Sequence, residues 1–81
     1  MEQVLTDVRT ERGRQEAEWG GQYTDDKNTQ SDWLRLIEHQ IHQARYHKAE
    51  FRERMIKIAA LAVASVESYD RGQVGSPSHC Q

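Results

Sequence analysis

Two carboxylates, Glu67 and Asp70 in the stretch ESYD, stand three residues apart near the end of an apolar segment. On a helix this spacing puts both side chains on one side, where they can share a Mg²⁺ ion. A charge beside a buried apolar run needs a partner or an ion. The same spacing is also common at a solvated helix end, where Arg71 offers a local partner, and both interpretations stay open.

A second group of candidate ligands lies in the stretch HQIHQA, where His39 and His42 are also three residues apart. Two histidines one turn apart can hold zinc or another transition metal. No third strong ligand stands at a matching spacing, and there is no cysteine pair. The pattern therefore favours solvated or hydrogen-bonded histidines over a metal site.

Arg12 and Gln15 fall between Val8 and Trp19 on the predicted inner side of the first helix. A guanidinium on such a side must meet a carboxylate, a carbonyl or an anionic ligand. One interpretation is a structural ion pair with Glu67 or Asp70. The other is a cleft arginine that binds a phosphate or a carboxylate.

Trp19 and Trp33 flank the loop that follows this helix. Each ring is more often part of a core than a surface for a nucleotide base. An aromatic face beside an arginine and amides is nevertheless what a nucleotide site would use.

Hydrophobic periodicity and glycines predict an all-α chain with a long helix, a loop and two further helices. We expect helices over residues 2–19, 32–47 and 48–71, with Ser31 as N-cap of the second and His47 at its end. Residues 1–71 form the predicted domain, and residues 72–81 a flexible tail.

The last helix is broadly apolar, and one stripe recurs along it at helical spacing. The stripe comprises Phe51, Met55, Ile58, Ala62, Val66 and Tyr69. A helix that is apolar nearly all round is buried on several sides. In a chain of 81 residues this predicts a second subunit, and hence a helical-bundle homodimer or higher homo-oligomer.

The composition, 36% hydrophobic and 30% charged, is typical of a soluble globular protein. A net charge of −2 argues against a dedicated DNA-binding protein. The longest apolar run, residues 58–64, is too short to cross a membrane. With no secretory signal pattern and one cysteine, Cys80, we expect a cytoplasmic protein.

Three segments together, ERGRQEAEWGG, DWLRLIEHQIHQA and FRERMIKIAALAVASVESYDR, resemble small phage and prophage proteins described as MazG-like. The resemblance implies an all-α nucleoside triphosphate pyrophosphohydrolase fold that assembles as dimers or tetramers. In that family an E-E-x-x-E motif and a later E-x-x-D motif bind Mg²⁺, which positions a nucleotide for attack by water.

Glu67 and Asp70 match the E-x-x-D motif. In an ungapped match of the earlier motif, its acidic places fall on His39, Gln40 and Gln43, none of which is a carboxylate. Glu38 is one residue out of phase, about 100° around the helix. The resemblance therefore implies a metal site that has been dismantled, with no Mg²⁺ cofactor unless hydrolysis survives.

Three functions remain open. The first is a non-catalytic protein that binds a nucleotide or a nucleotide-derived signal between helices or subunits. The second is an active Mg²⁺-dependent pyrophosphohydrolase, and the third is a module that binds a host protein. For the first, the predicted ligand-binding residues are Arg12, Gln15, Trp19, Trp33, His39, His42 and Gln43.

Overall fold

The computed structural model describes residues 1–19 and 27–72, apart from the side chain of Trp19. These residues form α1 (Glu2–Trp19), α3 (Gln30–Tyr46), the short 3-10 helix η1 (Lys48–Glu50) and α4 (Phe51–Asp70), with no strand among them. The all-helical prediction is confirmed. Residues 20–26 and 73–81, which include the predicted tail from Gln73 onward, lie outside this description. In the part described, no helix is both long and apolar enough to span a bilayer.

The start of α3 differs from the sequence prediction. Thr29, not Ser31, is the N-cap, and it forms a capping box with Asp32. The Thr29 hydroxyl accepts a hydrogen bond from the Asp32 amide at 3.1 Å, and the Asp32 carboxylate accepts one from the Thr29 amide at 3.0 Å. A capping box needs an acid or amide three residues after the cap. Thr29 has Asp32 there, whereas Ser31 has Leu34.

The ends of α3 and α4 follow the sequence prediction more closely. His47 is the C-cap of α3, and its amide donates to the Gln43 carbonyl at 2.8 Å. After α4, Gly72 has a φ of 73° and donates its amide to the Tyr69 carbonyl at 2.8 Å. A left-handed residue of this kind commonly ends a helix, and glycine adopts it without a steric cost from a Cβ atom.

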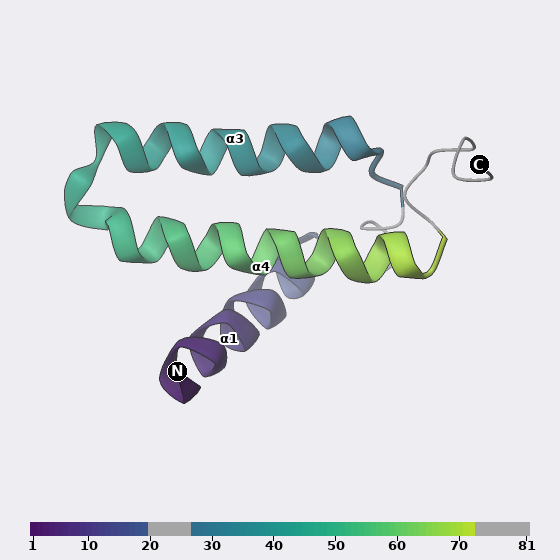
Figure 1. Cartoon of the computed structure of the whole chain (residues 1–81), viewed down its shortest axis with the longest axis horizontal. Helices are drawn as coiled ribbons and strands as arrows, with labels where there is room; N and C mark the ends of the chain where they lie inside the picture. Colours follow the sequence, from purple (N-terminus) through teal and green to yellow (C-terminus); the bar gives the residue numbers. More distant parts are fainter. Residues whose placement is uncertain (20–26, 73–81) are drawn as a thin grey trace.

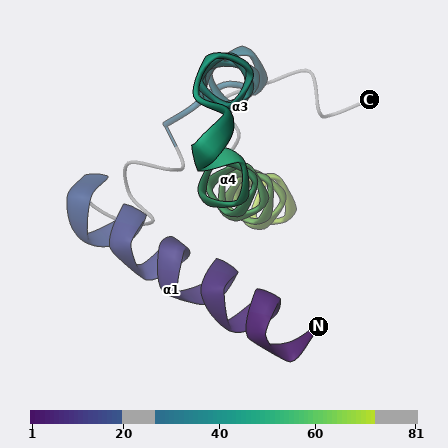
Figure 2. The same cartoon turned by 90° about the vertical axis from the view of Figure 1, so that its left-hand side faces the viewer.

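α4 lies between the other two helices. α3 and α4 run antiparallel side by side, joined through η1, and α1 crosses the other side of α4 (Figures 1 and 2). In the part of the chain that the structure describes, α1 packs on α4 and not on α3. Each side of α4 therefore has its own neighbour, and a site on one side does not include residues from the other.

The core lies between α3 and α4 and is small. Trp33, Leu61 and Ala64 form its buried cluster, with Leu36 and Ile37 packed against them. Ala60 and Ala64, which are 0% and 2% exposed, let the neighbouring helices approach α4 closely.

The stripe predicted along the last helix is not the buried side of α4 in the single chain. Its members are exposed or half-buried, and the buried residues of α4 are Ala60, Leu61, Ala64 and Ser68. Because α4 is apolar nearly all round, its pattern does not reveal which side α3 and α1 will cover.

Candidate functional site

The contact between α1 and α4 contains the arginine singled out from the sequence. The Arg12 side chain is only 12% exposed, and its Nη2 lies 3.0 Å from Glu16 Oε2 and 3.4 Å from Glu67 Oε1. Of the two acids considered as partners of Arg12, Glu67 is the one that contacts it. Both carboxylate partners are about half exposed, so the ends of this pair reach solvent.

A groove of about 410 Å³ runs along this contact. It is lined by Leu5, Val8, Arg9, Arg12, Gly13, Glu16, Val63 and Glu67. Its apolar residues come from both helices, and its charged residues are two arginines and two glutamates. The volume falls within the range of small-molecule sites in proteins. The groove therefore offers a ligand both apolar surface and charged groups of either sign.

Arg9 and Gly13 belong to the groove and were not among the residues predicted from the sequence. Residues 9, 12, 13 and 16 recur at helical spacing, so they share one side of α1. This spacing could have revealed both residues. The sequence prediction instead followed the side of α1 expected to be buried, which carries Val8 and Gln15. At Gly13 an added Cβ would meet nothing within 4 Å, so the helix backbone is open to the groove there.

Beside the groove, a polar network joins α1 to α4. Glu11 accepts hydrogen bonds from Arg14 at 2.6 Å, from Gln15 at 3.2 Å and from Lys57 of α4 at 3.4 Å. The hydrogen bonds from Arg14 lower the pKa of Glu11, and the nearby charge of Lys57 adds to this effect against the desolvation of the carboxylate.

Gln15, predicted to bind a ligand, is 3% exposed, and its Oε1 accepts no hydrogen bond from the described residues. It does not line the groove itself. Its amide nitrogen instead supports Glu11, so in this chain Gln15 contributes to the network that attaches α1.

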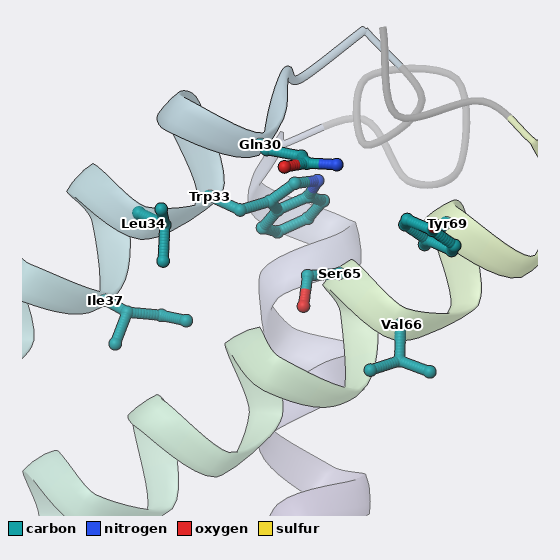
Figure 3. A pocket seen from close by; sticks show the side chains of 7 residues that line it. All are labelled: Gln30, Trp33, Leu34, Ile37, Ser65, Val66 and Tyr69. Atoms are coloured by element: carbon teal, nitrogen blue, oxygen red, sulfur yellow. The ribbon is translucent and has the colours of Figure 1, made fainter. Parts of the chain in front are cut away.

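Trp33 lies on the other side of α4. It is 3% exposed, and its ring points from α3 toward α4 at the edge of an open hollow of about 280 Å³ (Figure 3). The hollow is lined by Gln30, Trp33, Leu34, Ile37, Ser65, Val66 and Tyr69. Ser65 and Gln30 supply the polar side chains, so this hollow is mostly apolar.

The predicted residues on α3 do not join Arg12 within one chain. His39 and His42 are exposed on α3, and the ring of His42 lies 4.6 Å from that of Tyr46, centroid to centroid. Gln43 is half-buried on the same helix, which does not touch α1. The side chain of Trp19 lies outside the described residues.

Glu67 and Asp70 are both exposed near the end of α4. Within residues 1–19 and 27–72, no group of three or more histidine, cysteine or acidic side chains is arranged to hold a metal ion. The guanidinium of Arg12 contacts Glu67, so this carboxylate already has a cation beside it.

No family model, no curated protein and no solved structure matches this chain.

Proposed function

We propose that this chain is a non-catalytic helical protein that binds a nucleotide, or a nucleotide-derived signal, in the groove between α1 and α4. The observation that carries the proposal is the position of Arg12, whose mostly buried side chain lies in a groove lined by both apolar and charged residues. Arg9 lines the same groove. The resemblance to MazG-like proteins supports a nucleotide as the class of ligand.

The chemistry of the groove matches the two parts of a nucleotide. Leu5, Val8 and Val63 offer apolar surface to a base or a sugar. The guanidiniums of Arg9 and Arg12 offer the paired donors that bind a phosphate. Open space at Gly13 lets a ligand approach the helix backbone closely.

A phosphate has to compete with the glutamates that now contact Arg12. Glu16 and Glu67 are 51% and 55% exposed, and ion pairs at such exposure contribute about 0–1 kcal/mol. A hydrogen bond between charged groups in a shielded groove contributes about 1.5–3 kcal/mol. Phosphate and these carboxylates therefore compete for the same guanidinium, and phosphate binding requires Glu16 and Glu67 to give way to it.

The non-catalytic part of the proposal is supported by the pairing of Glu67. In a hydrolase of the MazG-like kind this carboxylate would bind Mg²⁺, whereas here it contacts Arg12 at 3.4 Å. In the free protein this pairing competes with Mg²⁺ at the same carboxylate. Once a nucleotide displaces Glu67, the lack of carboxylates at His39, Gln40 and Gln43 still leaves Mg²⁺ without its other ligands. We also infer that the chain acts as a homo-oligomer, because so little of its apolar surface is buried in one copy.

Calorimetric titration against mono-, di-, tri- and cyclic nucleotides tests the proposal. We expect at least one of them to bind, and Arg12→Gln to weaken that binding roughly tenfold or more because a charged hydrogen bond is lost. Arg35→Gln is the matched control, since Arg35 is 75% exposed on α3 and lies outside the groove. Binding to no nucleotide, or an equal loss in both variants, would contradict the proposal.

The hydrolase alternative is separated by an assay for phosphate and pyrophosphate with Mg²⁺ or Mn²⁺. We expect no release above the buffer control. Release that disappears in Glu67→Ala and Asp70→Ala would refute the non-catalytic assignment.

A further inference from the structure

α4 has a third side that neither α1 nor α3 covers, which we term the open face. It comprises Phe51, Met55, Ile58, Ala59, Ala62, Val66 and Tyr69. None of these residues is an aspartate, glutamate, lysine, arginine or histidine, and none is buried. Phe51, Val66 and Tyr69 are 59%, 56% and 52% exposed. The open face therefore runs the whole length of α4 as an apolar strip in contact with solvent.

α3 widens this strip on one flank. Leu34 and Ile41 are 59% and 41% exposed, and they stand seven residues apart, which puts them on the same side of α3. Leu34 and Val66 both line the hollow between α3 and α4 (Figure 3). The open face and the exposed side of α3 therefore form one continuous apolar surface with a depression in it.

A single copy buries few apolar side chains and leaves this surface in contact with water. Its buried apolar residues, in the part described, are Val8, Trp33, Ala60, Leu61 and Ala64. From the rise per residue and the spacing of packed helices, α3 and α4 of one copy together present a surface of about 600 Å². Two such surfaces bury about 1,200 Å², which is at the lower end for a specific interface.

We infer that the open face binds the open face of a second copy of this chain, with the two α4 helices antiparallel. The inference rests on the self-association proposed above and not on ligand binding. Charge favours this orientation. Arg52 and Asp70 are eighteen residues apart, which is five full helical turns, so they flank the open face on the same side. An antiparallel pair brings Arg52 of each copy, which also contacts Asp7 of its own chain at 2.6 Å, to the partner's Asp70.

The sizes of the side chains along the open face fit the same orientation. Phe51 and Tyr69 are also five turns apart and stand at its two ends, with Ala59 and Ala62 near its middle. Small residues at the crossing allow the helices to approach, and the bulky rings then pack at both ends. The open face is thus self-complementary about a two-fold axis near residues 60 and 61.

In this antiparallel arrangement, a side chain of the second copy can fill the hollow between α3 and α4. Met55 of each copy approaches the partner's Val66, which lines the hollow beside Trp33 and Tyr69. Methionine is flexible and fills irregular apolar spaces well. The hollow is therefore the socket for a side chain of the second copy.

Sedimentation analysis of two matched variants tests the interface. Val66→Asp places a charge in the open face, and we expect it to shift the protein from dimer to monomer. Val4→Asp is the control, because Val4 is 43% exposed on α1 and outside the open face. A wild-type monomer at high concentration would overturn the inference, and so would a Val66→Asp dimer.

Disulfide cross-linking tests the orientation of the two helices. Its variants keep the surface apolar, so the test remains informative if Val66→Asp fails to fold. Met55→Cys and Val66→Cys are made in a Cys80→Ser chain, since Cys80 is the one native cysteine. We expect a disulfide-linked dimer when the two variants are mixed and little when either is oxidised alone. Linkage of each variant to itself would mean a parallel pair and would overturn the inference. Neither measurement involves a nucleotide. A failure to find this interface therefore does not contradict nucleotide binding in the groove, and a failure to find nucleotide binding does not contradict this interface.

Discussion

α4 meets its two neighbouring helices in different ways. Against α3 it packs Leu61 and Ala64 on Trp33, so this contact is a buried apolar cluster. Against α1 it forms ion pairs at both ends and in the middle. Arg52 contacts Asp7 at 2.6 Å, Lys57 contacts Glu11 at 3.4 Å, and Glu67 contacts Arg12 at 3.4 Å.

This difference separates what holds the chain together from what is free to respond to a ligand. Burial of apolar surface is not screened by salt and does not depend on the protonation of carboxylates. Ion pairs at partly exposed positions are individually weak, and they weaken further when salt is added or when the carboxylate is protonated. We therefore expect the α3–α4 hairpin to be the stable unit and α1 to be the helix that adjusts, with the candidate groove between α1 and α4.

The largest effect is expected in the hairpin. Trp33→Ala should lower the free energy of unfolding by about 3–5 kcal/mol, because a large buried ring is replaced by a cavity. Urea denaturation at fixed protein concentration measures it. Tyr46→Ala is the control, since Tyr46 is an aromatic residue of the same helix that is 68% exposed. An equal loss in both variants would show that the cluster around Trp33 is not the main source of stability.

A smaller effect is expected in the network of α1. Glu11→Gln should cost about 2 kcal/mol, because it leaves Lys57, which is 16% exposed, beside a neutral group. Glu18→Gln makes the same chemical change at a carboxylate that also binds Arg14 but is 55% exposed, so it should cost under about 0.5 kcal/mol. The same denaturation experiment compares them, and equal costs would rule out a special role for Glu11.

Acid should release α1 before it melts the hairpin. The hydrogen bond from Arg52 lowers the pKa of Asp7, and those from Arg14 lower the pKa of Glu11. A carboxylate with a lowered pKa stabilises the fold above its ordinary pKa and loses that contribution as the pH falls through the lowered value. We therefore expect α1 to lose order below about pH 4.

The hairpin has acids of its own, Asp32 and Glu50, whose pKa values are also lowered. They lie at helix ends, so their protonation should loosen those ends and leave the packing of Trp33 in place. Nuclear magnetic resonance spectra recorded during an acid titration follow each helix separately. Simultaneous loss of all three helices would contradict the expected order.

The smallest effect is a gain. Gly13→Ala should stabilise the chain by about 0.5–1 kcal/mol, because glycine is unfavourable inside a helix and the new methyl group meets no atom. The same methyl group enters the groove, so nucleotide binding should weaken. Thermal unfolding and calorimetry on one variant measure both effects. If the variant is more stable but binds the nucleotide as well as the wild type does, the ligand does not occupy the part of the groove beside Gly13.

Much of this arrangement can be predicted from the sequence. Periodicity and glycines give the three helices, and an arginine on an apolar side of a helix indicates a carboxylate partner such as Glu67. The N-cap was misassigned because Ser31 and Thr29 are both good caps, and the acid three residues after Thr29, Asp32, was not used to decide between them.

The assembly of the site could not be predicted in this way. Arg12, His39 and Gln43 carry plausible chemistry, but whether they meet depends on which sides of α4 the other helices occupy. The pairs of Asp7 with Arg52 and of Glu11 with Lys57 set that geometry, and they join residues 45 and 46 positions apart in the sequence. No local pattern indicates such pairs, because charged residues are frequent on both helices.

Amide hydrogen exchange at low and high salt tests the contrast between the two contacts of α4 most directly. Raising the salt from about 0.1 M to about 1 M shortens the screening length from about 10 Å to about 3 Å. We predict that amides of α1 then exchange faster while those of α3 and α4 keep their protection. If α1 exchanges at the same rate in both conditions, or if the hairpin loses protection together with it, the ionic attachment of α1 is contradicted.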